Sequence, residues 1–482
     1  MLFNSIDFAI FLPIVFVLYW FIVNRNLKLQ NSLIVIASYV FYGWWDWRFL
    51  LLIFLSTIVD YTVGLQLSKA TKKSNRKILL WLSLLVNIGL LVYFKYYNFF
   101  LNNFITAFSF FGMHINANTL NIILPVGISF YTFQTLSYTI DIYRYKIKPT
   151  KNFIAFIAFV SFFPQLVAGP IERASNLLPQ FLRKREFNYS RAVDGTRQIL
   201  WGLFKKVVIA DNCARFANEI FSNSGDLNGS TLLLGVVFFT FQIYGDFSGY
   251  SDIAIGTARL FGFNLRQNFA FPFFSRSIPE VWRRWHISLT TWFRDYLFIP
   301  LYRKLPINHI TKIINILILF SVIGLWHGAS WNFALWGVLL ALYYMPSLFI
   351  KRKKQAPVVA QGNVLPSLKE MYKVSITFMK FMIAMIFFRA QSIEQVFVFF
   401  KKIFSFSLFE KPILSNYTFA LEISILIVVF MLVEWQGREH QFGIERFGFK
   451  WNRIIRFSIY YLIVFLIFWY ARQEEEFIYF QF

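Results

Sequence analysis

Hydrophobic residues in this chain gather in runs long enough to cross a lipid bilayer, with short polar connections between them. The runs lie near residues 6–23, 31–45, 49–67, 78–94, 121–142, 153–168, 198–212, 231–262, 312–349, 372–389, 419–436 and 455–471. Because lipid offers the backbone no hydrogen-bond partner, such runs are expected to form helices. The pattern predicts one all-α, polytopic membrane domain over residues 1–482, with about 11 transmembrane helices plus re-entrant helices.

Positive charge is concentrated in the connections and predicts an orientation. Of the 482 residues, 57% are hydrophobic and 15% are charged, and the formal net charge is +24. Lysine and arginine cluster in short segments at residues 25–28, 69–77, 144–151, 183–191 and 351–354. Under the positive-inside rule these segments lie in the cytoplasm, so both termini are expected outside it. The segments near 153–168 and 312–349 must then enter and leave the membrane on one side.

The same reasoning assigns the remaining segments and excludes some partners. Residues 351–370 are expected to form a cytoplasmic linker and residues 472–482 an extracytoplasmic tail. Basic charge confined to short loops, with 21% aromatic residues, suits membrane lipids and not nucleic acid. Cys213 is the only cysteine, which excludes an intrachain disulfide, and no metal site is predicted. The first run lacks a basic leader and a cleavage site, so it is expected to be a retained helix.

Ionisable groups inside an apolar run are costly in lipid, which makes each a candidate for function. Asp246 and Asp252 lie with Tyr250 in the glycine-containing stretch QIYGDFSGYSDIAIG, which begins at Gln242. Either the two aspartates belong to a polar site at membrane depth, or they cap helix ends.

A second stretch, PEVWRRWHISLTTWFRDYLFIP from Pro279, alternates cationic and aromatic residues. On an interfacial helix, Arg283 and Arg284 are placed to contact phosphate while the tryptophans are buried. The arginines would then receive a phosphorylated acyl carrier such as coenzyme A; the alternative is a plain anchor for anionic lipid. His286 lies in the same stretch.

A third stretch, GLWHGASWNFALWG from Gly324, contains His327 in otherwise apolar surroundings, directly after Trp326. A buried histidine often has only a packing role, but neutral imidazole is also the usual general base near neutral pH. The chain has no motif of the soluble hydrolases, zinc proteases or nucleotide-binding enzymes.

With these blocks, the sequence resembles the membrane-bound O-acyltransferase family, in its alginate O-acetyltransferase-like bacterial branch. Two further blocks support this, LPVGISFYTFQTLSYTIDIYR from Leu124 and FFPQLVAGPIER from Phe162. The resemblance implies helices ringed around a central tunnel in the bacterial cytoplasmic (inner) membrane. It also implies that His327 is catalytic, that His286 is a second polar residue of the tunnel, and that Asp246 and Tyr250 belong to its polar lining. Trp326 is expected to line the same tunnel and to contact the acyl donor there.

The C-terminal sequence, EEEFIYFQF from Glu474, is similar to a motif by which some of these systems present a tyrosine as an acyl relay. This implies a covalent role for Tyr479, since a phenol is a better leaving group than an alkyl alcohol. The alternative is an aromatic plug or a segment that docks a partner.

The resulting expectation is an O-acyltransferase with no bound cofactor. It would move acetyl from cytoplasmic acetyl-CoA across the membrane to an extracytoplasmic partner protein, which would O-acetylate a polysaccharide such as alginate or another cell-surface glycan. The alternatives are transfer of D-alanyl or of a lipid acyl group, a transporter without a covalent step, and a structural scaffold for polysaccharide export.

Overall fold

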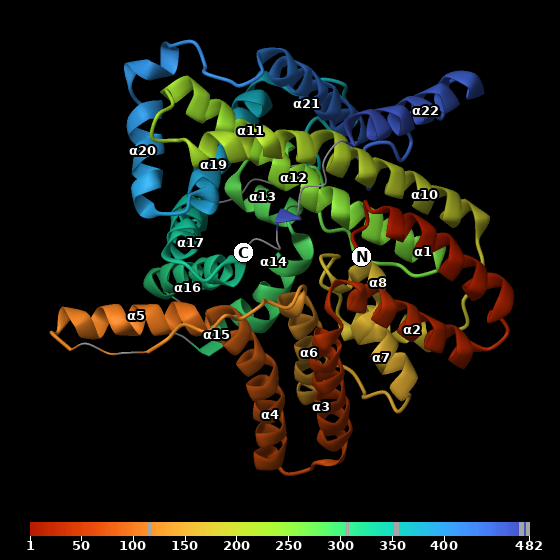
Figure 1. Cartoon of the computed structure of the whole chain (residues 1–482). Helices are drawn as coiled ribbons and strands as arrows, with labels where there is room; N and C mark the ends of the chain where they lie inside the picture. The colour runs from red at the N-terminus through yellow and green to blue at the C-terminus, as the bar shows by residue number, and fades with distance from the viewer. Residues whose placement is uncertain are drawn as a thin grey trace. The chain divides into compact units, whose positions relative to one another are not determined.

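The computed structural model describes residues 1–113, 115, 117–304, 306, 308–350, 356–471 and 477–478. In this part of the chain the regular elements are helices, with no β-strand, which confirms the all-α prediction (Figure 1). The chain forms two compact units. The first contains Met1–Ala192, Ala258–Arg266 and Gly328–Ser330, and the second contains Val193–Thr257, Gln267–His327 and Trp331–Phe482.

The helices of the first unit are mostly long and carry lipid-compatible side chains. They are α1 (Ile6–Val17), η1 (Leu18–Ile22), α2 (Leu27–Asp46), η2 (Trp47–Phe49), α3 (Leu50–Lys69), α4 (Lys73–Leu91), η3 (Val92–Tyr96), α5 (Tyr97–Phe110), α6 (Ile128–Tyr143), α7 (Phe153–Ser161), α8 (Phe163–Leu166) and α9 (Ala174–Phe181).

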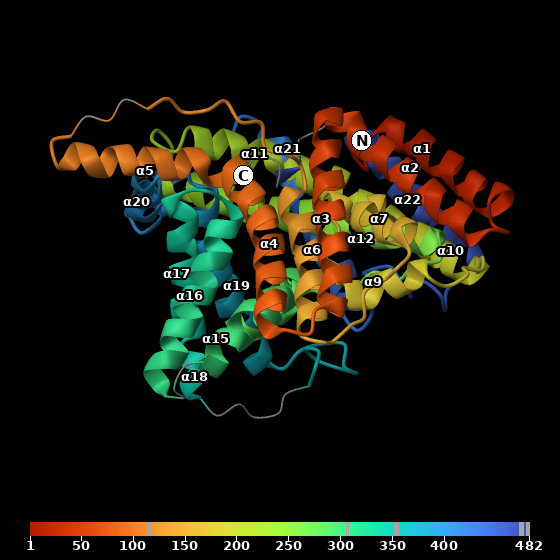
Figure 2. The ribbon, with the colours of Figure 1, turned by 90° about the horizontal axis from the view of Figure 1, so that it is seen from below.

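A buried polar cluster joins α3, α4 and α6, which lie side by side in both views (Figures 1 and 2). Asp60 on α3 accepts hydrogen bonds from Ser83 Oγ at 2.5 Å, Asn87 Nδ2 at 2.8 Å and Thr139 Oγ1 at 3.0 Å. All four side chains are fully or almost fully buried. Buried polar groups of this kind persist only when they are hydrogen-bonded, so the cluster fixes how the three helices align.

The second unit contains the helices from α10 to α22. The first residues of α10 and the last residues of α12 belong to the first unit. Its elements are α10 (Tyr189–Leu203), η4 (Phe204–Ala210), α11 (Asp211–Ser222), α12 (Gly229–Leu260), η5 (Pro272–Phe274), α13 (Ile278–Arg284), α14 (Ile287–Phe293), η6 (Arg294–Phe298), α15 (Ile299–Lys304), α16 (His309–His327), α17 (Trp331–Tyr344), α18 (Pro346–Phe349), α19 (Leu368–Arg389), α20 (Ile393–Ile403), η7 (Phe406–Phe409), α21 (Tyr417–Gly437) and α22 (Arg453–Tyr470).

Eight helical segments of the described chain are long and apolar enough to cross a membrane, which confirms a polytopic membrane protein. In α12 the most apolar window is 83% buried, whereas in the other seven this share is 11–39%. A helix that is apolar and buried on nearly all sides is a core helix. The functional candidates on α12 therefore lie in the interior of the fold and not on its lipid-facing surface.

The segment 312–349 forms two helices, α16 and α17, that pack side by side (Figures 1 and 2). Gly324 on α16 and Gly337 on α17 make this packing close, because a β-carbon on either would collide with the backbone of the other helix. Small residues at a helix crossing allow this approach of the two backbones. The close packing fixes the C-terminal end of α16, where His327 is the last residue.

Candidate active site

Close packing of α10 and η4 against α12 brings two lysines to the buried centre of the second unit. A β-carbon on Gly202 would lie 2.6 Å from the carbonyl oxygen of Gly249, and one on Gly249 would lie 2.7 Å from that of Gly202. Only glycine allows the two backbones to approach this closely. The crossing presents Lys205 and Lys206 directly to α12.

Lys206 forms ion pairs with two aspartates and Lys205 with one, and all these charged side chains are buried. Lys206 Nζ lies 2.8 Å from Asp246 Oδ1 and 2.8 Å from Asp211 Oδ1, and Lys205 Nζ lies 2.5 Å from Asp252 Oδ2. Burial opposes the charge on Lys206, but the two carboxylates outweigh this effect and raise its pKa. Ionic groups at this depth are retained only when paired.

Asp246 and Asp252 are therefore interior residues of α12 and do not cap its ends. Asp252 also accepts a hydrogen bond from Gln198 Nε2 at 2.8 Å. Asp246 Oδ2 accepts one at 2.7 Å from the backbone N–H of Ile478 near the C-terminus. The structure thus contradicts the helix-capping alternative, and the polar site at membrane depth stays a prediction.

His286 occupies the junction between α13 and α14, with a left-handed backbone at φ 42°. This conformation is uncommon for a residue other than glycine and is found often at functional sites. The imidazole is 1% exposed, and burial lowers its pKa to about 3, so it is neutral at physiological pH.

Asn268 orients the His286 ring. Its Oδ1 lies 3.2 Å from His286 Nδ1 and accepts hydrogen bonds from Ser288 Oγ at 2.8 Å and Ser288 N at 3.2 Å. An amide oxygen only accepts, so Nδ1 carries the proton in this arrangement and Nε2 carries the lone pair. Asn268 is held in turn by Ser251 on α12, since its Nδ2 donates to Ser251 Oγ at 3.2 Å.

Trp326 lies between the two candidate histidines. Its ring centroid is 6.0 Å from that of His286 and 4.9 Å from that of His327. Trp336 and Phe388 complete the surroundings of His327, with centroids at 5.2 and 5.3 Å. The structure thus brings all three residues predicted from two separate motifs into one buried aromatic cluster.

Tyr250 contacts the C-terminal segment. Its ring centroid lies 4.8 Å from that of Phe477, which is 1% exposed. Tyr250 is itself buried among the residues of α12. Tyr479, the predicted acyl relay, lies outside the described residues.

The two predicted phosphate-binding arginines line one cavity of about 1010 Å³ but have different environments. Arg284 is buried, with Nη2 donating to Glu280 Oε1 at 2.9 Å and Nη1 donating to the Ala270 carbonyl at 3.1 Å. Arg283 is exposed to the cavity and has no ion-pair partner in the described part of the chain. Of these two arginines, Arg283 is the one whose guanidinium faces the cavity without an ion-pair partner among the described residues.

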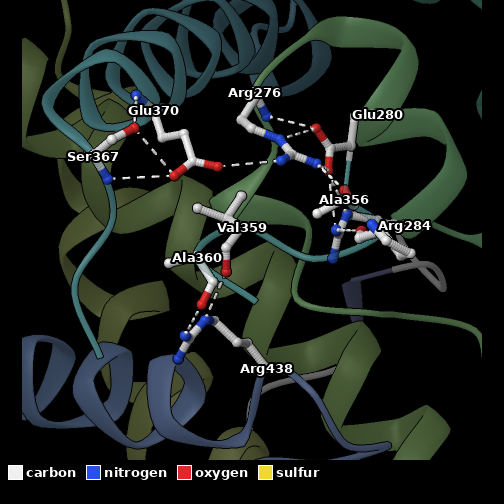
Figure 3. A network of polar contacts seen from close by, with 10 residues as sticks. Arg276, Glu280, Arg284, Ala356, Val359, Ala360, Ser367, Glu370 and Arg438 are labelled. Carbon is white, nitrogen blue, oxygen red and sulfur yellow. Dashed lines mark hydrogen bonds and ion pairs between the residues drawn. The ribbon is translucent and has the colours of Figure 1, made fainter. Parts of the chain in front are cut away.

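Arginines also fix the segment that follows residue 355 to the wall of this cavity (Figure 3). Arg276 donates to the Ala356 carbonyl at 2.7 Å and pairs with Glu280 at 3.0 Å. Arg438 donates to the carbonyls of Val359 and Ala360, both at 2.9 Å. The described part of the predicted linker is therefore held by backbone hydrogen bonds to buried arginines.

Glu280 is the acceptor that keeps Arg276 and Arg284 in place. Burial opposes its ionisation, but hydrogen bonds from Arg276 and the positive charges of both arginines outweigh this and lower its pKa. An anion shared by two buried cations stays ionised, so this part of the wall is built independently of any ligand.

Comparison with known proteins identifies the family. The sequence profile of the membrane-bound O-acyltransferase family, MBOAT, matches residues 39–385. The chain belongs to the membrane-bound O-acyltransferase family.

Similar proteins with O-acetylase names match most of the chain. It is 37% identical over 446 residues to the probable alginate O-acetylase AlgI of Pseudomonas aeruginosa. This match covers 91% of this chain and 81% of that protein. It is 34% identical over 507 residues to the protein of the same name from Pseudomonas putida, with all of both chains covered. It is also 34% identical over 426 residues to the peptidoglycan O-acetyltransferase of Helicobacter pylori, covering 82% of this chain and 78% of that protein. The protein is therefore a multi-pass membrane O-acyltransferase, as the sequence predicted.

Several residues that build the candidate site were not found from the sequence. Lys205, Lys206 and Glu434 all lie inside predicted apolar runs, and Glu434 accepts hydrogen bonds from Trp201 Nε1 at 2.9 Å and Tyr244 Oη at 2.5 Å. The rule that singled out Asp246, an ionisable group inside an apolar run, would have found all three. Asn268 lies in a connection, where no sequence signal separates it from an ordinary polar residue.

Proposed function

We propose that this acyltransferase moves an acetyl group from cytoplasmic acetyl-CoA to an extracytoplasmic partner protein, which O-acetylates a polysaccharide. The observation that carries the proposal is the buried cluster of His286, Trp326 and His327. Two buried histidines that both contact one aromatic ring, in a membrane protein of this family, suit acyl transfer in a site that excludes water. The O-acetylases among the relatives support acetyl as the group.

In this proposal His327 is the general base. The acceptor hydroxyl oxygen attacks the thioester carbonyl carbon, a C–O bond forms, and the C–S bond breaks. The hydroxyl proton passes to His327 and from there to the leaving sulfur, so the imidazole is neutral again at the end of the step. His286, whose Nε2 carries its lone pair, also contacts Trp326 and lines the path of the acyl group.

The proposed donor site is the cavity that Arg283 lines. Coenzyme A carries several phosphate charges, and Arg283, which has no ion-pair partner among the described residues, is suited to bind one of them. Lys373 and His440 line the same cavity. The charged coenzyme would remain there, while only the neutral acetyl group crosses the membrane.

The proposed acceptor side involves the C-terminal tail. The acetyl group would pass to the phenol oxygen of Tyr479, or directly to a serine of the partner protein. The proposed location is the bacterial cytoplasmic membrane, with both termini outside, and its support is the distribution of the basic connections. Reporter fusions at the two termini test this orientation: active periplasmic reporters at both ends are expected, and a cytoplasmic signal at either end would reject it.

Label transfer tests the reaction. Membranes containing wild type, His327→Ala, Tyr479→Phe and His309→Ala receive isotope-labelled acetyl-CoA, and base-labile label is measured on protein and glycan. His309 is the matched control because it is exposed at the opposite end of α16. We expect transfer by wild type and His309→Ala and none by His327→Ala.

The alternatives give different results in the same assay. If the wild-type protein, folded and supplied with its partner, transfers no label from acetyl-CoA, the acetyl donor is wrong, and D-alanyl and longer acyl donors are tested next. If glycan acetylation persists in His327→Ala, the histidine is not the base. Substrate flux without any acyl ester would indicate a transporter.

A further inference from the structure

Phe477 and Ile478, the described residues nearest the C-terminus, lie in the interior of the second unit beside α12. Phe477 is 1% exposed and Ile478 is 0% exposed. Terminal segments usually remain at the surface unless specific contacts hold them. One face of α12 contacts both residues.

A hydrogen bond attaches the backbone of the segment to a carboxylate. The N–H of Ile478 donates to Asp246 Oδ2 at 2.7 Å, and the other oxygen, Asp246 Oδ1, lies 2.8 Å from Lys206 Nζ. A hydrogen bond to an ionised acceptor is shorter and stronger than a neutral one. Asp246 thus uses one oxygen for Lys206 and the other for the tail.

Lys206 holds Asp246 in a cluster of buried charges. Lys206 is paired with Asp211 as well as Asp246, and all three side chains are buried. A buried negative charge without further hydrogen bonds is costly. The tail amide supplies a donor at this point, so the tail and the ion pairs stabilise each other.

Aromatic contacts hold the preceding side chain. The ring of Phe477 lies 4.8 Å from that of Tyr250 and 6.0 Å from that of Phe247. Asp246 and Tyr250 are four residues apart on α12, so they lie on the same face of the helix. One helical face therefore recognises both the backbone and a side chain of the C-terminal segment.

We propose that Asp246, fixed by Lys206, and the rings of Phe247 and Tyr250 form a docking site for the C-terminal segment. Asp246 is then a positioning residue that acts through the tail and does not contact the acyl donor. The role in transfer rests on the proposed function, because Tyr479 is the next residue along the chain after Ile478. The docking itself does not depend on it.

Hydrogen exchange measures the docking in the full-length protein. Peptides spanning the C-terminus report the exchange rate of the Ile478 amide in wild type, Asp246→Ala, Asp246→Asn and Phe477→Ala. The asparagine variant retains an oxygen that accepts the amide, and Phe477→Ala leaves every buried charge in place. We expect a rate increase of at least about tenfold for Asp246→Ala and for Phe477→Ala, and a smaller one for Asp246→Asn, since about 1.4 kcal/mol corresponds to a factor of ten.

Asp252→Ala is the matched control, because it removes another buried aspartate of α12 that pairs with a lysine, and no hydrogen bond joins it to the described tail residues, Phe477 and Ile478. Its exchange at Ile478 should equal that of wild type. Fast exchange already in wild type, unchanged exchange in both Asp246→Ala and Phe477→Ala, or an equal increase in Asp252→Ala would overturn the docking site.

Label transfer by the same variants separates this inference from the proposed function. If Asp246→Ala releases the tail and also abolishes labelling of Tyr479, both stand. If it releases the tail while glycan acetylation continues unchanged, the docking site stands and the relay through Tyr479 is rejected. If the tail remains docked, the inference fails whatever the activity is.

Discussion

Gly202 on α10 and Gly249 on α12 meet backbone to backbone, and a β-carbon on Gly249 would lie 2.7 Å from the carbonyl oxygen of Gly202. The lysines of the buried ion pairs lie on η4, which directly follows α10, and Asp246 and Asp252 lie on α12. The position of these charges therefore depends on the absence of two side chains.

Gly249→Ala should separate the two helices and lower the free energy of unfolding by about 1–3 kcal/mol, as overpacking does. The measurement is the thermal unfolding midpoint of the purified protein in detergent. Gly89→Ala is the control, because a β-carbon there meets no atom within 4 Å. Equal midpoints for the two variants would show that the close crossing is not required.

Arg283→Ala and Arg284→Ala should have different effects. Removing Arg284 leaves Glu280 with one cation fewer in a buried site, at a cost of about 3–5 kcal/mol in stability. Removing Arg283 should leave the unfolding midpoint close to that of wild type and raise KM for the acyl donor. Donor dependence is measured in membranes, and stability in detergent; unchanged KM in Arg283→Ala would reject its contact with phosphate.

His286 should make the protein less stable as pH falls. Its pKa is about 3 when folded and near 6.5 in an unfolded chain, so protonation favours unfolding between these values. This residue alone should reduce the free energy of unfolding by up to about 1.4 kcal/mol per pH unit below pH 6.5.

His286→Asn tests this dependence, because asparagine tolerates the left-handed backbone at this position. Unfolding midpoints measured from pH 4 to pH 7 should change less steeply in this variant than in wild type. His309→Asn removes an exposed histidine and controls for the loss of a histidine as such. Parallel pH curves for wild type and His286→Asn would contradict the prediction.

Glu434→Ala should lower the thermal unfolding midpoint, because the buried Trp201 N–H and Tyr244 O–H lose their common acceptor. Each unsatisfied buried donor costs about 1–3 kcal/mol. Glu434→Gln keeps one acceptor oxygen and should have an intermediate midpoint. Glu422→Ala, on the exposed side of the same helix, removes an acceptor from one tyrosine and should cost less. Similar losses for both alanine variants would contradict the importance of the buried acceptor.

The sequence by itself determined the fold class and most of the candidate residues. Long runs of apolar residues are expected to form helices in lipid. An ionisable group in such a run is conspicuous because placing it in lipid costs free energy. For this reason Asp246 and His327 could be selected without coordinates, whereas His286 was selected from its cation–aromatic stretch and the family resemblance. The roles of His327 and Tyr479 remain predictions from the family resemblance.

Tertiary structure alone decided which of these groups contact one another and which of them face a cavity where a ligand can bind. Nothing in the two motifs indicates that Trp326 lies beside His286, or that Arg284 is engaged by Glu280 while its neighbour Arg283 faces a cavity. Contacts between residues far apart in sequence depend on how helices cross. Here the crossings are set by the close approach of glycines and by buried hydrogen bonds, whose partners no local pattern specifies.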